Sequence, residues 1–284
     1  RFFYFSSMSN SFGPIGFFDS GVGGTSVWSA VNNLLPNEST IYVADSANAP
    51  YGERSAETIL ALSIKNTDFL ISKGCKLIVV ACNTATTNAI AVLREKYTIP
   101  FIGIEPAIKP AALQTLTGKV GLLATKGTLG SALFHKTVLE NAGGVEIIEQ
   151  EGTGLVALIE GGFADGEEVA ELLKSYLLPM QEKGIDRLVL GCTHYPYLIP
   201  AIKKILSSRI EIIDAAGAVA KQTKKVLEKE GLLVRETVTE ELTANDLISK
   251  AASYEFYSNG ATDVLKSFMP SSCLRSTLHY STDF

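Results

Sequence analysis

The sequence lacks the features that mark several classes of protein. Its 284 residues include four cysteines, none in a CxxC pair, which favours reduced thiols in a cytosolic enzyme over a disulfide framework. The net charge is −5 and no dense run of lysine and arginine occurs, so we expect neither nucleic acid nor an anionic membrane as a main partner. No apolar run approaches the roughly 20 residues that span a bilayer. We therefore expect a soluble, cytoplasmic globular protein.

The apolar content is sufficient for two ordinary cores. Hydrophobic residues make up 46% of the chain, and no low-complexity stretch interrupts it. Short apolar segments alternate with helical patterns, which is typical of mainly parallel sheets covered by helices. We predict strands near 15–18, 41–44, 77–81, 101–104, 120–124, 145–149, 188–191 and 210–213.

Further elements are predicted from helical periodicity and from turn residues. Two amphipathic helices run over 55–73 and 167–183, and each is followed by a glycine that can end it. A basic amphipathic helix is predicted over 217–229, and a late strand over 254–258 could add to the first half of the fold. The stretch 270–284 has no readable periodicity, so we expect it to be disordered or loosely packed.

The two halves of the chain follow the same plan. In each half a short apolar strand delivers one cysteine to its C-terminal end, Cys82 in the first half and Cys192 in the second. We therefore predict an α/β protein with two similar lobes, each a mainly parallel sheet flanked by helices, that face each other across a cleft. The predicted first lobe comprises 11–107 plus 214–269, the second 108–213, and 1–10 and 270–284 are extensions of unknown order.

Both cysteines fall where ligands bind in proteins of this class. In open α/β sheets the ligand lies beyond the carboxyl ends of the strands, where helix N-termini also point, and Asp19, Ser20 and Thr125 are predicted at the same edge. A helix N-terminus or a nearby imidazolium makes a thiol easier to ionise, so a thiolate base and a thiol acid can coexist near neutral pH. One removes a proton while the other delivers one, and a carbon held between them is inverted. The predicted reaction is racemisation or epimerisation.

Other interpretations of the same residues fit less well. A disulfide exchanger would need adjacent thiols, whereas these belong to separate strands. A zinc site at Cys192 and His194 would lack a second closely spaced ligand pair, and a hydrolase built on those two residues would leave Cys82 unused. The glycine loop at 19–25 has neither the GxGxxG spacing nor the lysine of a P-loop, which argues against a nucleotide.

An amino acid suits this set of residues better than a nucleotide. Backbone N–H groups and short polar side chains at the strand ends can hold carboxylates, and Asp19 could meet an ammonium group or orient a thiol. We interpret the remaining cysteines, Cys75 and Cys273, as small buried hydrophobes. The side chains that we expect to hold carboxylates are Ser20, Asn83, Thr84 and Thr193.

Four motifs together resemble the signature set of bacterial glutamate racemases, in the aspartate/glutamate racemase family. They are FDSGVGG at 18–24, PYG at 50–52, ACNTA at 81–85 and GCTHYP at 191–196. They occur in order within a similarity that covers roughly residues 14 to 233, and a weaker echo follows in FYSNG at 256–260. The family fold has two α/β lobes, with the C-terminal region returning to the first.

The resemblance implies a cofactor-independent, two-base racemase that interconverts L-glutamate and D-glutamate, the latter for peptidoglycan and hence for the cell wall and cell shape. Cys82 would deprotonate D-glutamate and Cys192 L-glutamate, each acting as the acid in the reverse direction. Asp19, His194 and Glu160 match residues that assist the thiols. The resemblance implies glutamate as the partner, no metal, and a homodimer as a common state. The substrate contacts that it implies are Asp19, Ser20, Pro50, Tyr51, Gly52, Asn83, Thr84, Thr125, Thr193 and His194.

Two alternatives stay open on sequence alone. An aspartate racemase, a hydantoin racemase or a maleate isomerase also has two cysteines, and one methylene changes binding by only about 1–3 kcal/mol in an apolar pocket. A non-catalytic amino-acid sensor could also be built from two α/β lobes.

Each of the assisting residues also has an ordinary structural interpretation when it is taken singly. Asp19 could be a helix cap, Tyr51 ordinary packing, Glu160 the solvated end of a helix and His194 a core histidine.

Overall fold

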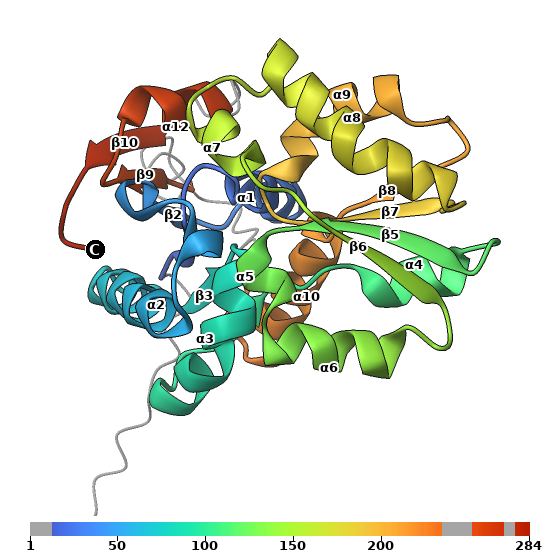
Figure 1. The fold of residues 1–284 in the computed structure, drawn as a ribbon. Helices are drawn as coiled ribbons and strands as arrows, with labels where there is room; N and C mark the ends of the chain where they lie inside the picture. The colour runs from blue at the N-terminus through green and yellow to red at the C-terminus, as the bar shows by residue number, and fades with distance from the viewer. Residues whose placement is uncertain (1–12, 235–251, 270–275) are drawn as a thin grey trace, which may run out of the picture.

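A computed structural model describes residues 13–234, 252–269 and 276–284, and its strands form two separate sheets (Figure 1). All neighbouring strands run parallel, so the predicted α/β architecture of two parallel sheets flanked by helices is confirmed. The six-stranded sheet has the order β10 (Ser276–Tyr280), β9 (Tyr254–Ser258), β2 (Thr40–Ala44), β1 (Ile15–Asp19), β3 (Leu77–Val80), β4 (Phe101–Gly103). The four-stranded sheet has the order β6 (Glu146–Glu151), β5 (Lys119–Ala124), β7 (Arg187–Gly191), β8 (Glu211–Ile213).

Helices flank each sheet, and each sheet with its helices is called a lobe below (Figure 1). The larger lobe has α1 (Thr25–Leu34), α2 (Ala56–Ser72), α3 (Asn83–Lys96), α10 (Ala216–Lys229) and α12 (Thr262–Phe268). The smaller lobe has α4 (Ile108–Gln114), α5 (Lys126–Leu129), α6 (Ala132–Asn141), α7 (Leu155–Glu160), α8 (Glu167–Glu182) and α9 (Ile199–Ile205). Short 3-10 turns η1 (Ser46–Asn48), η2 (Tyr51–Glu53) and η3 (Tyr195–Leu198) follow strands.

The helix boundaries agree with the signals in the sequence. The hydroxyl of Ser55 accepts a hydrogen bond from the N–H of Thr58 at 3.3 Å and so caps the first turn of α2. Gly74 and Gly184 follow α2 and α8 with φ angles of +78° and +85°, a conformation that favours glycine and ends a helix. The predicted helix over 217–229 is α10, which packs against α1, and the predicted late strand is β9, which pairs with β2.

The expectation of disorder or loose packing for 270–284 is wrong for its last nine residues, 276–284. Residues 276–280 form β10, which pairs in parallel with β9, and Phe284 is only 2% exposed. The Phe284 ring packs on that of Phe69 from α2, with 5.0 Å between the centroids. An edge strand of five mostly half-exposed residues leaves little periodicity, which explains why the sequence pattern misses it. Residues 1–10 and Cys273 lie outside the described part of the chain.

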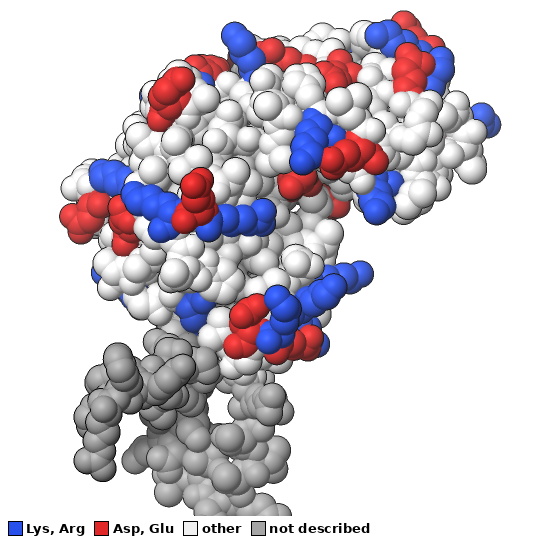
Figure 2. All heavy atoms as spheres, turned by 90° about the horizontal axis from the view of Figure 1, so that it is seen from below, with Lys and Arg blue, Asp and Glu red and all other residues white. Residues whose placement is uncertain are grey.

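The surface carries charges of both signs. On the face shown in Figure 2, lysines and arginines alternate with aspartates and glutamates, and no extended positive patch forms there. This face therefore offers no large field for a polyanionic partner. Within residues 13–234, 252–269 and 276–284, none of the helices combines the length and the apolar character needed to cross a membrane.

A buried ion pair fixes the end of the larger lobe that lies opposite the cysteine-bearing strand ends. Lys76 and Glu38 precede β3 and β2, and their paired side chains are 1% and 2% exposed. Lys76 Nζ also donates to the carbonyl of Leu232 at 2.9 Å, and Glu38 accepts the N–H of Val234 at 2.8 Å. The pair thus ties the chain after α10 to the starts of two central strands.

Removing one partner of this pair should be strongly destabilising. Lys76→Met leaves the Glu38 carboxylate buried without its cation, so we expect the free energy of unfolding to fall by about 3–5 kcal/mol. Urea unfolding followed by far-UV circular dichroism measures this change. Lys229→Met, which removes the exposed Lys229–Glu230 pair, is the control and should leave stability nearly unchanged. Equal effects of the two substitutions would contradict the importance of burial.

Candidate active site

The two lobes bring both predicted cysteines to one cavity. Cys82 lies two residues beyond the end of β3 and caps α3, because its sulfur accepts the N–H of Ala85 at 3.4 Å. Cys192 directly follows β7 in the other sheet, and the two cysteines are 5% and 7% exposed. The cavity between the lobes is lined by Ser20, Pro50, Tyr51, Gly52, Cys82, Asn83, Thr84, Thr125, Val156, Cys192, Thr193 and His194.

This sulfur cavity contains most of the residues that the sequence singles out. Only two of the predicted site residues, Asp19 and Glu160, do not line the cavity. Asp19 is hydrogen-bonded to Ser20 and Glu160 to His194, and both of these partners line it. Val156 lines it without having been predicted, because its place in the apolar segment of α7 looks like ordinary core packing. The free space in the cavity is about 10 Å³, close to what one water molecule needs, so the cavity must widen before an amino acid can enter.

Asp19, the last residue of β1, connects the larger lobe to the smaller one. Its carboxylate accepts hydrogen bonds from the hydroxyl of Ser20 at 3.0 Å and the N–H of Gly21 at 2.9 Å. Its second oxygen accepts the hydroxyl of Thr193, which comes from the other lobe, at 2.7 Å. Complete burial raises the pKa of Asp19 to about 6, although the charge of His194 and the Thr193 and Gly21 hydrogen bonds act in the opposite direction.

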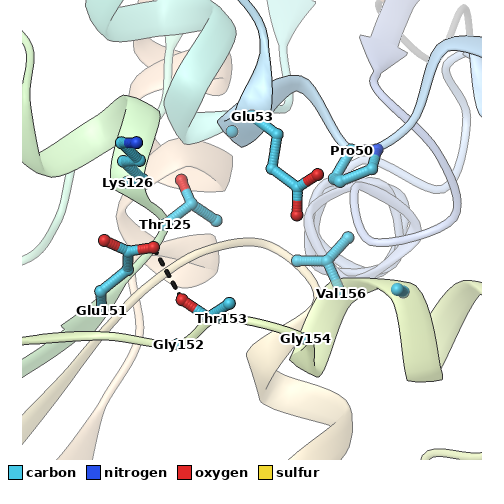
Figure 3. Close-up of a pocket in the computed structure, with 11 residues that line it drawn as sticks. Pro50, Glu53, Thr125, Lys126, Glu151, Gly152, Thr153, Gly154 and Val156 are labelled. Atoms are coloured by element: carbon cyan, nitrogen blue, oxygen red, sulfur yellow. Dashed lines mark hydrogen bonds between the residues drawn. The ribbon is translucent and has the colours of Figure 1, made fainter.

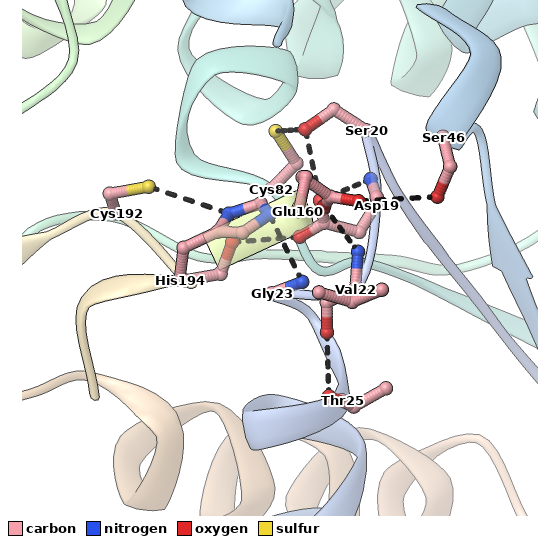
Figure 4. Close-up of polar contacts among 12 residues, drawn as sticks. Asp19, Ser20, Val22, Gly23, Thr25, Ser46, Cys82, Glu160, Cys192 and His194 are labelled. Atoms are coloured by element: carbon pink, nitrogen blue, oxygen red, sulfur yellow. Dashed lines mark hydrogen bonds and ion pairs between the residues drawn. The ribbon is translucent and has the colours of Figure 1, made fainter. Parts of the chain in front are cut away.

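Cys82 lies on the acidic side of the site. Its thiol lies 3.8 Å from the Ser20 oxygen, toward which it can donate, and the Ser20 hydroxyl donates in turn to Asp19 (Figure 4). Burial, followed by the negative charge of Asp19, raises the pKa of the Cys82 thiol far above its ordinary value. The neutral thiol is therefore the resting form of Cys82 in this closed arrangement.

Cys192 lies on the basic side. His194 Nδ1 is 3.7 Å from the Cys192 sulfur, and Nε2 is 2.6 Å from a carboxylate oxygen of Glu160, the last residue of α7 (Figure 4). Burial acts against the imidazolium, but the contacts with Cys192 and Glu160 outweigh it, so the pKa of His194 lies well above its usual value. The two sulfurs thus face one cavity from oppositely charged surroundings.

The lobes touch through glycines at the loop after β1. The N–H of Val22 donates to Glu160 across the cleft at 2.7 Å. A β-carbon added at Gly21 would lie 1.8 Å from the Glu160 carboxylate, and one at Gly23 would lie 2.3 Å from the His194 ring. A side chain at either position would have to displace the Glu160 carboxylate or the His194 ring, so the loop is a close contact surface between the lobes.

A second pocket adjoins the sulfur cavity, and Figure 3 shows the residues that line it. It shares Pro50, Gly52, Thr125 and Val156 with that cavity. Its remaining residues include the exposed side chains of Glu53, Lys126 and Thr153. This pocket therefore forms the mouth of the site.

Two predicted substrate contacts have contrasting environments. The hydroxyl of Tyr51 donates to Asp45 and accepts from Asn66 at 3.1 Å, so only the ring and backbone of Tyr51 are available to a ligand. The amide of Asn83 is buried, and neither of its polar atoms has a hydrogen-bond partner among the described residues. A buried amide that has no protein partner and lies beside a cavity is available to hydrogen-bond a polar ligand.

The described residues hold no cluster of three or more histidine, cysteine or acidic side chains arranged to bind a metal ion. Cys192 contacts Nδ1 of His194, whereas Glu160 contacts Nε2 on the opposite side of the imidazole ring. The three side chains therefore do not surround one point. Around the cavity lie two thiols, an imidazole and two carboxylates, all of them groups that can accept or donate protons.

Comparison with known proteins gives matches over most of the chain. The model of the Asp/Glu/hydantoin racemase family matches residues 23–223. The glutamate racemase of Ectopseudomonas mendocina is 47% identical over 227 residues, covering 80% of this chain and 86% of that protein. The glutamate racemase of Herpetosiphon aurantiacus is 46% identical over 224 residues, covering 79% and 88%.

Solved structures match over nearly the whole chain. A glutamate racemase isoform from Bacillus anthracis superposes with a TM-score of 0.81 at 30% identity, covering 96% of this chain and 98% of that one. The Francisella tularensis glutamate racemase, solved in complex with D-glutamate, gives a TM-score of 0.78 at 30% identity with the same coverage. The resemblance inferred from the four motifs is therefore confirmed at the level of the family.

The buried Asp19 carboxyl should make stability depend on pH. Because the folded protein binds the Asp19 proton more tightly than the unfolded chain, the contribution of Asp19 to stability should fall as the pH rises from about 4 to about 6. Asp19→Asn removes this titration, so between those pH values the variant should lose less stability than the unsubstituted protein, by on the order of 3 kcal/mol. Urea unfolding at a series of pH values measures both slopes. Parallel curves would contradict a raised pKa for Asp19.

Proposed function

Because the chain belongs to the Asp/Glu/hydantoin racemase family and is an isomerase, we propose that it interconverts L-glutamate and D-glutamate by two-base proton transfer between Cys82 and Cys192. The observation that carries this proposal is the position of the two sulfurs, which come from the ends of strands in separate sheets and line one cavity. A single-thiol enzyme would have no use for the second sulfur at a matching strand end.

Glutamate is the substrate best supported by the relatives. The curated proteins that match at 46–47% identity are named glutamate racemases. Among the solved structures, that of Escherichia coli glutamate racemase, 30% identical to this chain, is in complex with L-glutamate and the activator UDP-MurNAc-Ala. An aspartate racemase from Picrophilus torridus, at 18% identity, shares the fold alone. We infer that the D-glutamate produced is used for peptidoglycan, as the family resemblance implies.

The proton transfer can be written with all atoms balanced. With the α-carbon between the sulfurs, the thiolate of one cysteine takes the α-proton and becomes a thiol. The thiol of the other cysteine gives its proton to the opposite face and becomes a thiolate, so the carbon is inverted. Cys192 would act first on L-glutamate and Cys82 on D-glutamate. Exchange with solvent then restores the starting protonation states.

The assisting groups would stabilise each thiolate in turn. The His194 imidazolium, held by Glu160, lies beside Cys192 and can stabilise its negative charge or return a proton to it. On the other side, Ser20 links the Cys82 thiol to Asp19, whose pKa of about 6 lets the carboxyl exchange a proton near neutral pH. The two cysteines thus have separate proton partners, as a reversible reaction requires.

The substrate carbanion needs stabilisation because an α-hydrogen is a very weak acid. Acid–base catalysis supplies roughly 10² to 10⁴ in rate, and the rest must come from groups that stabilise charge in a closed, dry site. The unsatisfied amide of Asn83, at the N-terminus of α3, would hold the α-carboxylate as it becomes enolate-like. Ser20, Thr84, Thr125 and Thr193 offer further hydroxyl groups around the same cavity.

Replacing either thiol should abolish turnover while sparing the fold. With each enantiomer of glutamate and no added cofactor, Cys82→Ser and Cys192→Ser should each lower kcat by at least roughly 100-fold, because one proton donor or acceptor is lost. Circular dichroism of the amino acid follows the reaction. The control is Cys75→Ala, a buried cysteine outside the cavity, which should keep its activity.

The same assay separates the alternatives. Faster turnover of aspartate than of glutamate would show that aspartate, and not glutamate, is the preferred substrate. Ligand binding by the unsubstituted protein without turnover of either amino acid would favour a sensor. Full activity of either serine variant would overturn the two-base proposal.

Lobe closure gives a second test, at Gly21. Gly21→Ala places a methyl group where the Glu160 carboxylate lies, so it should either displace that carboxylate from His194 or keep the lobes apart, and either change should lower kcat/KM by roughly 100-fold or more. The control is Gly217→Ala in α10, where nothing lies within 4 Å of the added carbon, and it should keep full activity. Steady-state kinetics at matched protein concentration measures both. An unimpaired Gly21→Ala variant would contradict the need for this close contact.

A further inference from the structure

A buried carboxylate lies behind the loop at 50–52 and has no part in the proton transfers proposed above. Asp45 directly follows β2 and is fully buried. One of its oxygens accepts hydrogen bonds from the amides of Asn48, at 2.7 Å, and Asn259, and the other accepts the hydroxyl of Tyr51. None of the ion pairs found within the described ranges involves Asp45, so neutral donors alone satisfy the Asp45 carboxylate.

Asn259 is itself held in a fixed orientation. It directly follows β9, and its side-chain oxygen accepts the N–H of Ala47 at 2.9 Å. Its side-chain nitrogen is thereby turned toward Asp45 and also lies 3.4 Å from the carbonyl of Phe284. A β-carbon added at the next residue, Gly260, would lie 2.7 Å from the Ser46 side chain, so this turn packs tightly on η1.

Tyr51 connects this network to the sulfur cavity. Its hydroxyl lies between Asp45 and the Asn66 amide of α2, while the residue itself lines the cavity with Pro50 and Gly52. The loop at 50–52 is therefore held from β2, from β9 and from α2. Gly52 in turn packs against Thr125 of the smaller lobe, where an added β-carbon would lie 2.9 Å from the threonine side chain.

We propose that Asn259 is a positioning residue for the racemase: through Asp45 and Tyr51 it fixes the loop at 50–52, which forms one wall of the substrate cavity. The inference rests on the proposed function and extends it to a segment of the chain far from either cysteine. Asn259 follows β9 and lies 214 residues from Asp45 in sequence, so this late strand acquires a role in substrate binding.

The position of the loop predicts which kinetic constant responds. Neither cysteine belongs to the 50–52 loop, so its displacement should weaken substrate binding without removing a proton donor or acceptor. Asn259→Ala leaves the buried Asp45 carboxylate short of one donor, and we expect KM for both glutamate enantiomers to rise roughly tenfold. The kcat should change by less than about threefold.

Asn259→Asp provides a test of the hydrogen bond itself. The new carboxyl oxygen can still accept the N–H of Ala47, but an ionised side chain faces the Asp45 carboxylate and repels it. When a proton is shared between the two carboxyls, its O–H replaces the amide donor. The KM of Asn259→Asp should therefore fall toward that of the unsubstituted protein as the pH is lowered from about 8.5 to about 6, whereas that of Asn259→Ala should stay high.

A matched control and a second variant complete the experiment. Asn141→Asp makes the same substitution on α6, where the amide donates to the carbonyl of Thr137, and it should leave KM unchanged. If the Asn259 variants do not fold, Tyr51→Phe removes only the hydroxyl and should raise KM in the same way.

Three outcomes would overturn the proposal: an unchanged KM in the folded variants, a loss confined to kcat, or identical pH profiles for Asn259→Ala and Asn259→Asp. If the unsubstituted protein racemises glutamate and the variants keep its KM, only this inference is refuted. If the unsubstituted protein does not racemise glutamate at all, the proposed function is refuted.

Discussion

The close approach of the two lobes at the glycine loop is the contact on which the rest of the site depends. Each sulfur is delivered by a short strand buried in its own sheet, so the relative position of the sulfurs is set by how the sheets meet. Several hydrogen bonds cross between the lobes there, and the two shortest to the site carboxylates run from the N–H of Val22 to Glu160 and from the hydroxyl of Thr193 to Asp19, each 2.7 Å long. Side chains at 21 and 23 would displace the Glu160 carboxylate or the His194 ring, so the small residues of this loop are needed for the arrangement of the site.

The same contact places opposite charges beside the two thiols. Asp19 contributes negative charge on the side of Cys82, and the protonated His194 contributes positive charge on the side of Cys192. Both groups are buried, so their effects are little screened by water. Opening of the lobes would break the Asp19–Thr193 and Glu160–Val22 bonds and admit water. The opening that admits substrate would therefore also change the charges and the water around the two thiols.

Periodicity and the positions of the cysteines were enough to predict most of the architecture and the centre of the site. Strand ends can be read from apolar runs, and residues at the ends of central parallel strands meet at one edge. Other features carry no local signal. The β10 strand depends on pairing with β9, Val156 looks like core, and the Glu160 contact uses the backbone N–H of Val22, which any residue except proline would offer. The link between Asn259 and Asp45 joins residues too far apart for spacing to reveal it.

The most direct test of the central claim is the fate of the α-hydrogen during the first part of the reaction in D₂O, starting from L-glutamate. If two thiols act on opposite faces, the first D-glutamate formed carries deuterium at the α-carbon, while the L-glutamate that remains carries almost none. Mass spectrometry of the separated enantiomers gives both values. D-glutamate that retains the original hydrogen, or deuterium that enters both enantiomers equally from the start, would contradict a mechanism with one base on each side of the substrate.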